Sequence, residues 1–218
     1  MTVKYYDWAE YQSNFRPKKI AIKEISNGRE TSYYELNQRS KSLAGWLQKK
    51  GLKKGDRVAI LAHNCAEVFE LEFACGKVGG VELPLNWRLT KPELEYILND
   101  SEPMSLIYSI EFRDIAKELI KDCKIKNSLM IEENNYESEY EKAISENNEF
   151  EIVESNHDDL IMLMYTSGTT GHPKGAMINH QMQFFNTVNL GATARITDKT
   201  IQLVVLPLFH TGGMNCYA

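Results

Sequence analysis

Apolar strand-like runs alternate with helical segments through the front of this chain, and this alternation restricts the fold more than any other feature. The apolar runs that predict strands lie at 57–61, 81–85, 104–108 and 128–131. Helical spacing and capping signals between them predict three helices, one capped by Asn64 with Glu67, one from Thr90 to about Asn99, and one over 111–122. Because this pattern is typical of βαβ units, the sequence predicts an α/β fold with largely parallel sheets flanked by helices.

Turn and capping signals define a further region before this alternating part. Asn27-Gly28 lies between two alternating apolar and polar runs and therefore predicts a β-hairpin with a two-residue turn. Ser32 and Glu35 form a capping box at the start of a long helix. Gly51 follows two lysines and is expected to end that helix.

The stretch from Met164 to Gly175 reads MYTSGTTGHPKG and follows the apolar run 160–164. Such a run predicts a buried strand, so the loop should leave its carboxyl end, where open α/β sheets bind ligands. Glycines let backbone N–H groups approach an anion, hydroxyls can donate to phosphate oxygens, and Lys174 adds positive charge. The spacing differs from the Walker loop, because two residues separate Gly171 from Lys174. Composition alone leaves open a polyanion loop or a Gly/Thr-rich turn between two strands.

Beyond this loop, the sequence predicts a strand at 176–178, a helix that starts at Asn179 or His180 and runs to about Ala194, and a buried strand from Ile201 to Leu206. Pro207 should end the last strand. The following LPLFHTGG stretch places turn-forming residues and His210 just after a strand, so we expect it on the same edge of the sheet as the loop.

The order TSGTTGxPKG resembles the phosphate-loop signature of the AMP-forming adenylating enzymes, the superfamily of acyl-CoA synthetases, luciferases and peptide-synthetase adenylation domains. Three more stretches resemble blocks of the same superfamily in the same order: TSYYELNQRSKSLAGWLQKKGLKKGDRVAI, GGVELPLNWRLTKPELEYILNDSEP and LPLFHTGG. The amino-acid sequences of these stretches are closer to those of acyl- and aryl-CoA ligases than to those of peptide-synthetase domains. The resemblance therefore implies the N-terminal domain portion of the acyl-CoA synthetase fold.

The resemblance also implies an activity and a site. The family joins a carboxylic acid to ATP, releases pyrophosphate, and passes the acyl group from AMP to the thiol of CoA, with Mg²⁺ present. The residues implied to hold the nucleotide phosphates are Thr166, Ser167, Gly168, Thr169, Thr170, Gly171 and Lys174. Lys174 is also a catalytic candidate, and Thr169 is the candidate contact for Mg²⁺.

His210 is the second catalytic candidate, because the matching histidine of the family lies beside the acyl carboxylate and the route of the thiol. Without the resemblance, a lone histidine after an apolar run is more often a packed residue. The entrance for the acyl group is implied to include Phe209, His210, Thr211, Gly212, Gly213 and Met214. Phe209 and Met214 fit a packed core equally well.

Members of the family are longer than this chain, and its 218 residues lack the family's adenine and ribose blocks, its hinge and its small C-terminal domain. We therefore expect residues 1–218 to be a partial N-terminal AMP-binding domain that does not complete turnover alone. Its parts are expected to be a βα-alternating part at 1–131, an acidic connection at 132–156, and a part at 157–218 with the phosphate loop and the start of the acyl site. Because Glu132 to Glu154 contains nine glutamates and one lysine, we interpret the connection as solvated and mobile.

Composition excludes several classes of partner. A net charge of −5 without a basic stripe argues against nucleic acid. Four cysteines without paired spacing, no signal-like N-terminus and no apolar run of membrane-spanning length predict a cytoplasmic protein with reduced thiols and no transmembrane segment. A homodimer is left open. The tryptophans are expected in packing, and His63, His157, His172 and His180 on the surface or in caps.

Three functions follow from these observations. The first is an acyl-CoA synthetase, with fatty, aryl and dicarboxylic acids all open as substrates. The second is a non-catalytic module that binds a nucleotide or phosphate. The third is an adenylation domain that loads a carrier protein instead of free CoA.

Overall fold

The computed structural model describes residues 7–133, 135–146, 149–166 and 173–214. Its strands form a two-stranded hairpin and a six-stranded sheet of order β6-β5-β3-β4-β7-β8. They are β1 Ile20–Lys23, β2 Glu30–Ser32, β3 Arg57–Leu61, β4 Val81–Pro84, β5 Ser105–Ser109, β6 Asn127–Ile131, β7 Leu160–Thr166 and β8 Lys174–Asn179. Neighbouring strands from β6 to β7 are parallel, and β8 pairs antiparallel with β7. The predicted α/β fold with a largely parallel sheet is confirmed.

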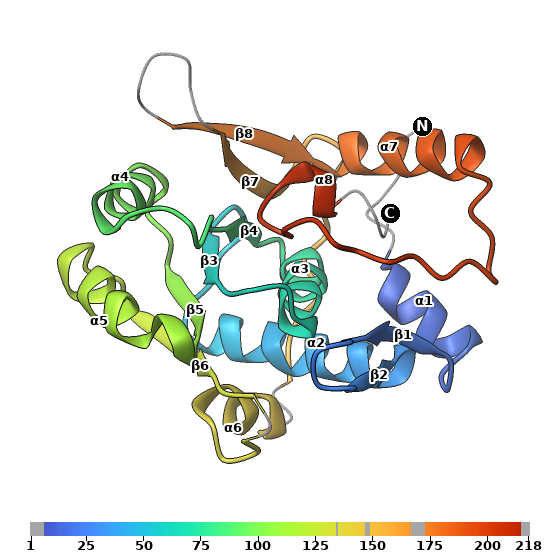
Figure 1. Ribbon diagram of the computed structural model, residues 1–218, viewed down its shortest axis with the longest axis horizontal. Coiled ribbons are helices and arrows are strands. Elements are labelled where there is room, and N and C mark those ends of the chain that lie inside the picture. Colours follow the sequence, from blue (N-terminus) through green and yellow to red (C-terminus); the bar gives the residue numbers. More distant parts are fainter. Residues whose placement is uncertain (1–6, 134, 147–148, 167–172, 215–218) are drawn as a thin grey trace.

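Helices cover both faces of the large sheet (Figure 1). They are α1 Trp8–Phe15, α2 Tyr33–Lys49, α3 Ala66–Val78, α4 Lys91–Ser101, the 3-10 helix η1 Ile110–Phe112, α5 Arg113–Asp122, α6 Glu139–Ser145, α7 His180–Thr193 and α8 Thr211–Met214. One apolar core joins the sheet to α2, α3 and α6, and a second joins its other face to α4 and α5. Both β4 and β5 are buried along their whole length, and apart from Glu82 in β4 their residues are apolar or small.

Local signals that satisfy backbone groups define most helix ends. The capping boxes Ser32/Glu35 and Thr90/Glu93 are both formed, as predicted. Gly79 ends α3 with a positive φ of 71°, a conformation that glycine adopts without a steric cost.

The turn between β1 and β2 is longer than predicted. Lys23 pairs with Glu30, so six residues connect the strands and the two-residue turn is wrong. The side chain of Asn27 accepts a hydrogen bond from the Arg29 N–H at 2.8 Å, and the Gly28 N–H donates to the Glu24 carbonyl at 2.9 Å. These local hydrogen bonds close a wider loop than the dipeptide signal predicts.

Asn64 does not cap α3. The N-cap is Cys65, which makes no side-chain capping bond. The side-chain amide of Asn64 instead forms hydrogen bonds with the backbone of Leu206 and Leu208, more than 140 residues away. A long-range partner thus replaces the local one that the spacing predicts.

The acidic segment is not simply a solvated connection. Its helix α6 buries Tyr140, Ala143 and Ile144, whose spacing places them on one face. Glu141 accepts two hydrogen bonds from the guanidinium of Arg39, at 2.6 and 2.8 Å. The interpretation of this whole segment as solvated and mobile is therefore wrong over α6.

The predicted buried strand from Ile201 to Leu206 is also wrong. Ile201 is 97% exposed, Leu203 65% and Val205 74%, and no strand of the described residues pairs with this segment. An extended segment becomes a strand only when a neighbouring ladder takes up its backbone groups. The apolar run alone could not specify that neighbour.

His180 is buried and the N-cap of α7 is Asn179, so the prediction of a surface or capping position is wrong. It is the first residue of α7, its N–H donates to the Asp159 carbonyl at 3.1 Å, and burial lowers the pKa of its imidazole to about 4. Trp46 lies in the core as expected. No helix in the described part of the chain is long and apolar enough to cross a membrane.

Candidate functional site

The β7–β8 hairpin carries the ends of the glycine- and threonine-rich loop. Thr166 is the last residue of β7 and pairs with Lys174, the first residue of β8, so these two candidates face each other at the base of the loop. The side chain of Lys174 is exposed. The other loop candidates lie outside the described residues: Ser167, Gly168, Thr169, Thr170 and Gly171.

The base of this hairpin is anchored to the second core. A Cβ on Gly175 would lie 2.9 Å from the Leu163 side chain and 3.3 Å from the ring of its cross-strand partner Tyr165, so these side chains cover the glycine closely. The hydroxyl of Tyr165 donates to the Asp100 carboxylate at the end of α4. These contacts hold the point from which the loop leaves the sheet. Because the loop joins two antiparallel strands, it is a hairpin connection, and this connection is compatible with a ligand-binding loop.

His210 lies in a tight turn that leads into α8. Its N–H donates to the Pro207 carbonyl at 3.2 Å, and its own carbonyl accepts from the N–H groups of Gly213 and Met214. The Gly212 N–H donates to the imidazole Nδ1 at 3.0 Å. Since Nδ1 accepts a hydrogen bond, the neutral ring carries its proton on Nε2. The exposed imidazole therefore presents Nε2–H as a hydrogen-bond donor.

A close backbone contact requires glycine at position 213 of this turn. A Cβ on Gly213 would lie 2.2 Å from the Pro207 carbonyl oxygen, and one on Gly212 would lie 2.9 Å from the Leu206 side chain. Thr211 is exposed, whereas Met214 is 5% exposed and belongs to the first core. The sequence leaves two places open for Met214, the acyl entrance and a packed core. Its side chain lies in the core.

A chain of aromatic contacts that includes Phe209 lies at the carboxyl ends of three parallel strands. The ring of Phe209 lies 6.0 Å from that of Trp87, and the guanidinium of Arg88 lies over both rings, at 4.8 Å from Trp87 and 5.8 Å from Phe209. His63 contacts Trp87 at 4.5 Å and Phe112 at 5.1 Å between ring centroids. We call these five side chains the aromatic cluster. It joins the loops after β3, β4 and β5 to the segment that carries His210.

Topology explains why these residues meet. The neighbouring strands β3 and β5 are followed by α3 and α5, which lie on opposite faces of the sheet. Open α/β sheets bind ligands in the crevice at such a point. The parallel strand β7 ends at the same edge, so Thr166 and the aromatic cluster are both at the carboxyl edge. Sequence reasoning did not single out His63 or Arg88 for the site, although both follow strand ends.

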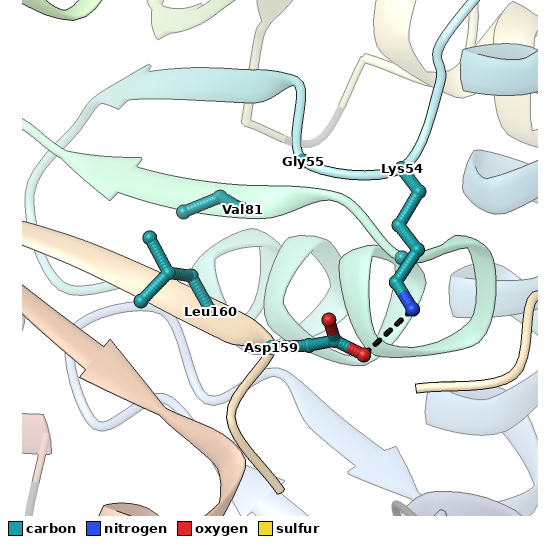
Figure 2. A pocket seen from close by; sticks show the side chains of 6 residues that line it. Lys54, Gly55, Val81, Asp159 and Leu160 are labelled. Atoms are coloured by element: carbon teal, nitrogen blue, oxygen red, sulfur yellow. Dashed lines mark ion pairs between the residues drawn. The ribbon is translucent and has the colours of Figure 1, made fainter. Parts of the chain in front are cut away.

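A pocket of about 290 Å³ lies at the opposite edge of the sheet (Figure 2). An ion pair of 2.6 Å between Lys54 and Asp159 spans it. The pocket lies at the amino ends of β3, β4 and β7, and its lining residues are Lys54, Gly55, Gly79, Val81, Asp159 and Leu160. It is therefore separate from the loops at the carboxyl edge and holds none of the predicted site residues.

Within the described ranges, no group of three or more histidine, cysteine or acidic side chains could hold a metal ion. The Mg²⁺ candidate Thr169 lies outside those ranges. The described side chains thus give no acidic ligand set, and the predicted Mg²⁺ contact stays a prediction.

Similar proteins are CoA ligases. A feruloyl-CoA synthase from Amycolatopsis is 34% identical over 211 residues, which cover 96% of this chain and 40% of that protein. The structure of ATP-bound MatB from Rhodopseudomonas palustris has a TM-score of 0.81 and 30% identity, and the match covers 95% of this chain and 42% of that one. The o-succinylbenzoate CoA synthetase MenE from Bacillus subtilis, in complex with the acyl-adenylate OSB-AMP, has a TM-score of 0.82 and 29% identity, with 99% and 53% covered.

The chain thus spans about two fifths of the length of the curated relatives that it matches. The family described as "AMP-binding enzyme" matches residues 9–218, almost the whole chain. The match includes both the β7–β8 hairpin and the turn that carries His210. This chain therefore belongs to the AMP-binding enzyme family.

Proposed function

We propose that this chain is the N-terminal part of an AMP-forming acyl-CoA synthetase. The reaction joins a carboxylic acid to ATP, releases pyrophosphate, and transfers the acyl group from AMP to CoA. The observation that carries the proposal is TSGTTGHPKG on a hairpin at the carboxyl edge of a parallel sheet, in a member of the AMP-binding enzyme family. The proposed division of the chain is 1–131, the acidic connection 132–156, and 157–218.

In the first step, a carboxylate oxygen of the acid attacks the α-phosphorus of ATP and pyrophosphate leaves. The developing charge on the leaving phosphates must be neutralised while the reacting atoms stay in line. Lys174, at the base of the hairpin, would supply positive charge, and residues 166–171 would supply hydroxyl and N–H donors. Mg²⁺ would add charge neutralisation when bound, with Thr169 as its proposed contact.

His210 is proposed to act on the acid. Because the Gly212 N–H occupies Nδ1, the ring offers Nε2–H as its free donor. That group can donate a hydrogen bond to a carboxylate oxygen of the acid and so orient the other oxygen for attack. In the second step, the sulfur of CoA attacks the acyl carbon, the thiol proton is released to solvent, and AMP leaves with the electrons of the broken acyl–oxygen bond. Phe209, Thr211, Gly212 and Gly213 are proposed to line the approach of the acyl group.

The relatives support the reaction class and leave the acid open. The names of similar proteins agree on CoA ligation, but their acids differ: ferulate, 2-succinylbenzoate and long-chain fatty acids. Similarity to ATP-bound MatB and to the acyl-adenylate complex of MenE supports binding of ATP and formation of an adenylate. The acid substrate therefore stays a matter for experiment.

The test is carboxylate-dependent exchange of pyrophosphate with ATP, measured on the full-length gene product with a broad panel of acids. We expect exchange with at least one acid and formation of its CoA thioester. Absence of exchange with every acid would contradict the proposal. An acyl group transferred to a carrier protein but not to CoA would instead identify a carrier-loading adenylation domain. Binding of ATP to this chain without exchange by the full-length product would identify a non-catalytic nucleotide-binding module.

A further inference from the structure

Asn64 holds the backbone of the segment that carries His210. Its side-chain Nδ2 donates to the Leu206 carbonyl at 2.9 Å, and its Oδ1 accepts from the Leu208 N–H, also at 2.9 Å. A single amide thus pairs with one donor and one acceptor that flank Pro207, as a neighbouring strand would. The loop between β3 and α3 thereby fixes a chain segment that has no strand partner among the described residues.

Short contacts transmit this restraint to the imidazole. The carbonyl of Pro207, between the two bonded residues, accepts the His210 N–H at 3.2 Å. The imidazole then accepts the Gly212 N–H at 3.0 Å on Nδ1. Only three steps therefore separate the Asn64 amide from the ring: the peptide around Pro207, the turn to His210, and the bond that fixes the tautomer.

Gly213 and Leu208 restrain the same segment independently. The Cα of Gly213 lies so close to Pro207 that a Cβ would be 2.2 Å from its carbonyl oxygen. The side chain of Leu208 is 4% exposed and packs in the first core. The two bonds from Asn64 add a hydrogen-bonded restraint on the backbone at both sides of Pro207.

We infer that Asn64 is a positioning residue that sets the orientation of the His210 imidazole. The inference rests on the proposed function as far as the role of His210 in catalysis is concerned. The restraint itself does not depend on it. Asn64 contacts no reacting atom in this account and acts through the backbone of Leu206 and Leu208.

The restraint is tested on this chain by hydrogen exchange at the Leu208 amide. In Asn64→Ala we expect exchange to be faster by roughly tenfold, because the N–H loses its acceptor. Asn64→Asp keeps an acceptor for that N–H but loses the donor to Leu206, so the increase should be smaller. The matched control is Asn27→Ala, which removes another loop asparagine with two hydrogen bonds and should leave Leu208 unchanged. Equal exchange in wild type and both Asn64 variants would overturn the inference.

The catalytic consequence is tested in the full-length gene product by a double-mutant cycle. We expect Asn64→Ala to lower kcat for acyl-CoA formation by roughly 10- to 100-fold, with KM for ATP changed by less than about twofold. The same substitution should have no further effect in a His210→Ala background, because the residue that Asn64 positions is gone. Equal losses in both backgrounds would show a general structural effect and reject the positioning role. A wild type without any activity would reject the proposed function, while the exchange experiment would still decide the restraint.

Discussion

Glu82 is a fully buried carboxyl group in the middle of β4. Its exposure is 0%, and neither of its side-chain oxygens has a hydrogen-bond partner among the described residues. Burial, with the nearby Glu72 carboxylate as the second cause, raises the pKa of Glu82 well above its ordinary value of 4.5. Glu72 on α3 is also buried and accepts a hydrogen bond from Gln183 on α7. Ionisation of Glu82 is therefore costly in the folded state.

This carboxyl predicts an unusual dependence of stability on pH. Because the folded pKa is raised, Glu82 contributes most to stability below its unfolded pKa, and that contribution is lost as the pH rises through the folded pKa. We expect Glu82→Leu to raise the free energy of unfolding by about 1 to 3 kcal/mol at about pH 8 and by much less at about pH 4. Urea unfolding at the two pH values measures both.

The matched control is Glu67→Leu. Glu67 is also buried but pairs with Arg29 at 2.6 Å, so its removal should lower stability at about pH 8. If Glu82→Leu left the pH dependence of unfolding unchanged, the account of the buried carboxyl would be wrong.

Lys174 is exposed, so its removal should affect chemistry far more than folding. In the full-length gene product, we expect Lys174→Ala to reduce pyrophosphate exchange by on the order of 100-fold, because the positive charge that would neutralise the leaving phosphates is lost. The free energy of unfolding should change by less than about 0.5 kcal/mol. Lys117→Ala, which removes another exposed lysine on α5, should change neither quantity. Parallel losses of exchange and stability in Lys174→Ala would contradict the role.

At the scale of elements, one arginine joins three helices. Arg39 on α2 bonds Glu70 on α3 through Nε at 2.6 Å and Glu141 on α6 through both terminal nitrogens. The hydroxyl of Tyr140, also on α6, donates to the other oxygen of Glu70 at 2.7 Å. Glu70 is fully buried, so its charge depends on these partners. The ion pairs explain why an acidic segment folds back onto the domain.

Removal of the Arg39 side chain should therefore destabilise the fold strongly. We expect Arg39→Ala to lower the free energy of unfolding by about 3 to 5 kcal/mol, because it leaves the buried Glu70 with only the more distant Arg29 guanidinium, at 3.6 Å. Guanidinium unfolding measures the change. Arg113→Ala, at an exposed pair 3.6 Å from Asp114, should cost less than about 0.5 kcal/mol. Comparable losses in the two variants would show that burial does not govern these pairs.

Elements whose signals are local were predictable from the sequence, and elements whose partners are distant were not. The capping box of Ser32 and Glu35 lies within one helical turn, so spacing suffices to identify it. Asn64 has an equally good local signal, but its partners at Leu206 and Leu208 are supplied by the fold. For the candidate site, motif order is the basis on which Lys174 and His210 are proposed, and their roles stay predictions. The contacts that His63 and Arg88 make within the aromatic cluster depend on which strands are neighbours, and no local pattern specifies that order.

At the scale of the whole molecule, the two apolar cores cover the two faces of the six-stranded sheet. Many apolar side chains that follow β7 in the chain nevertheless remain exposed. They lie on β8, α7 and the extended segment before Pro207: Met177, Met182, Phe185, Val188, Ile201, Leu203, Val205 and Leu206. Single exposed apolar residues are common on soluble proteins, but so many exposed apolar side chains on three consecutive segments favour association or dye binding.

We therefore expect this 218-residue chain to bind the apolar dye ANS while folded and to self-associate as its concentration rises. The combined substitution Phe185→Gln and Leu203→Gln, at side chains 50% and 65% exposed, should reduce both dye fluorescence and the apparent mass in light scattering. It should not lower the unfolding midpoint, because neither side chain belongs to a core cluster. Ile25→Gln is the matched control, since Ile25 is 76% exposed but lies on the loop between β1 and β2 and does not belong to the apolar side chains after β7. If Ile25→Gln reduced dye binding as much as the double substitution does, the dye would be reporting scattered apolar residues, and the concentration of apolar side chains after β7 would have no physical consequence of its own.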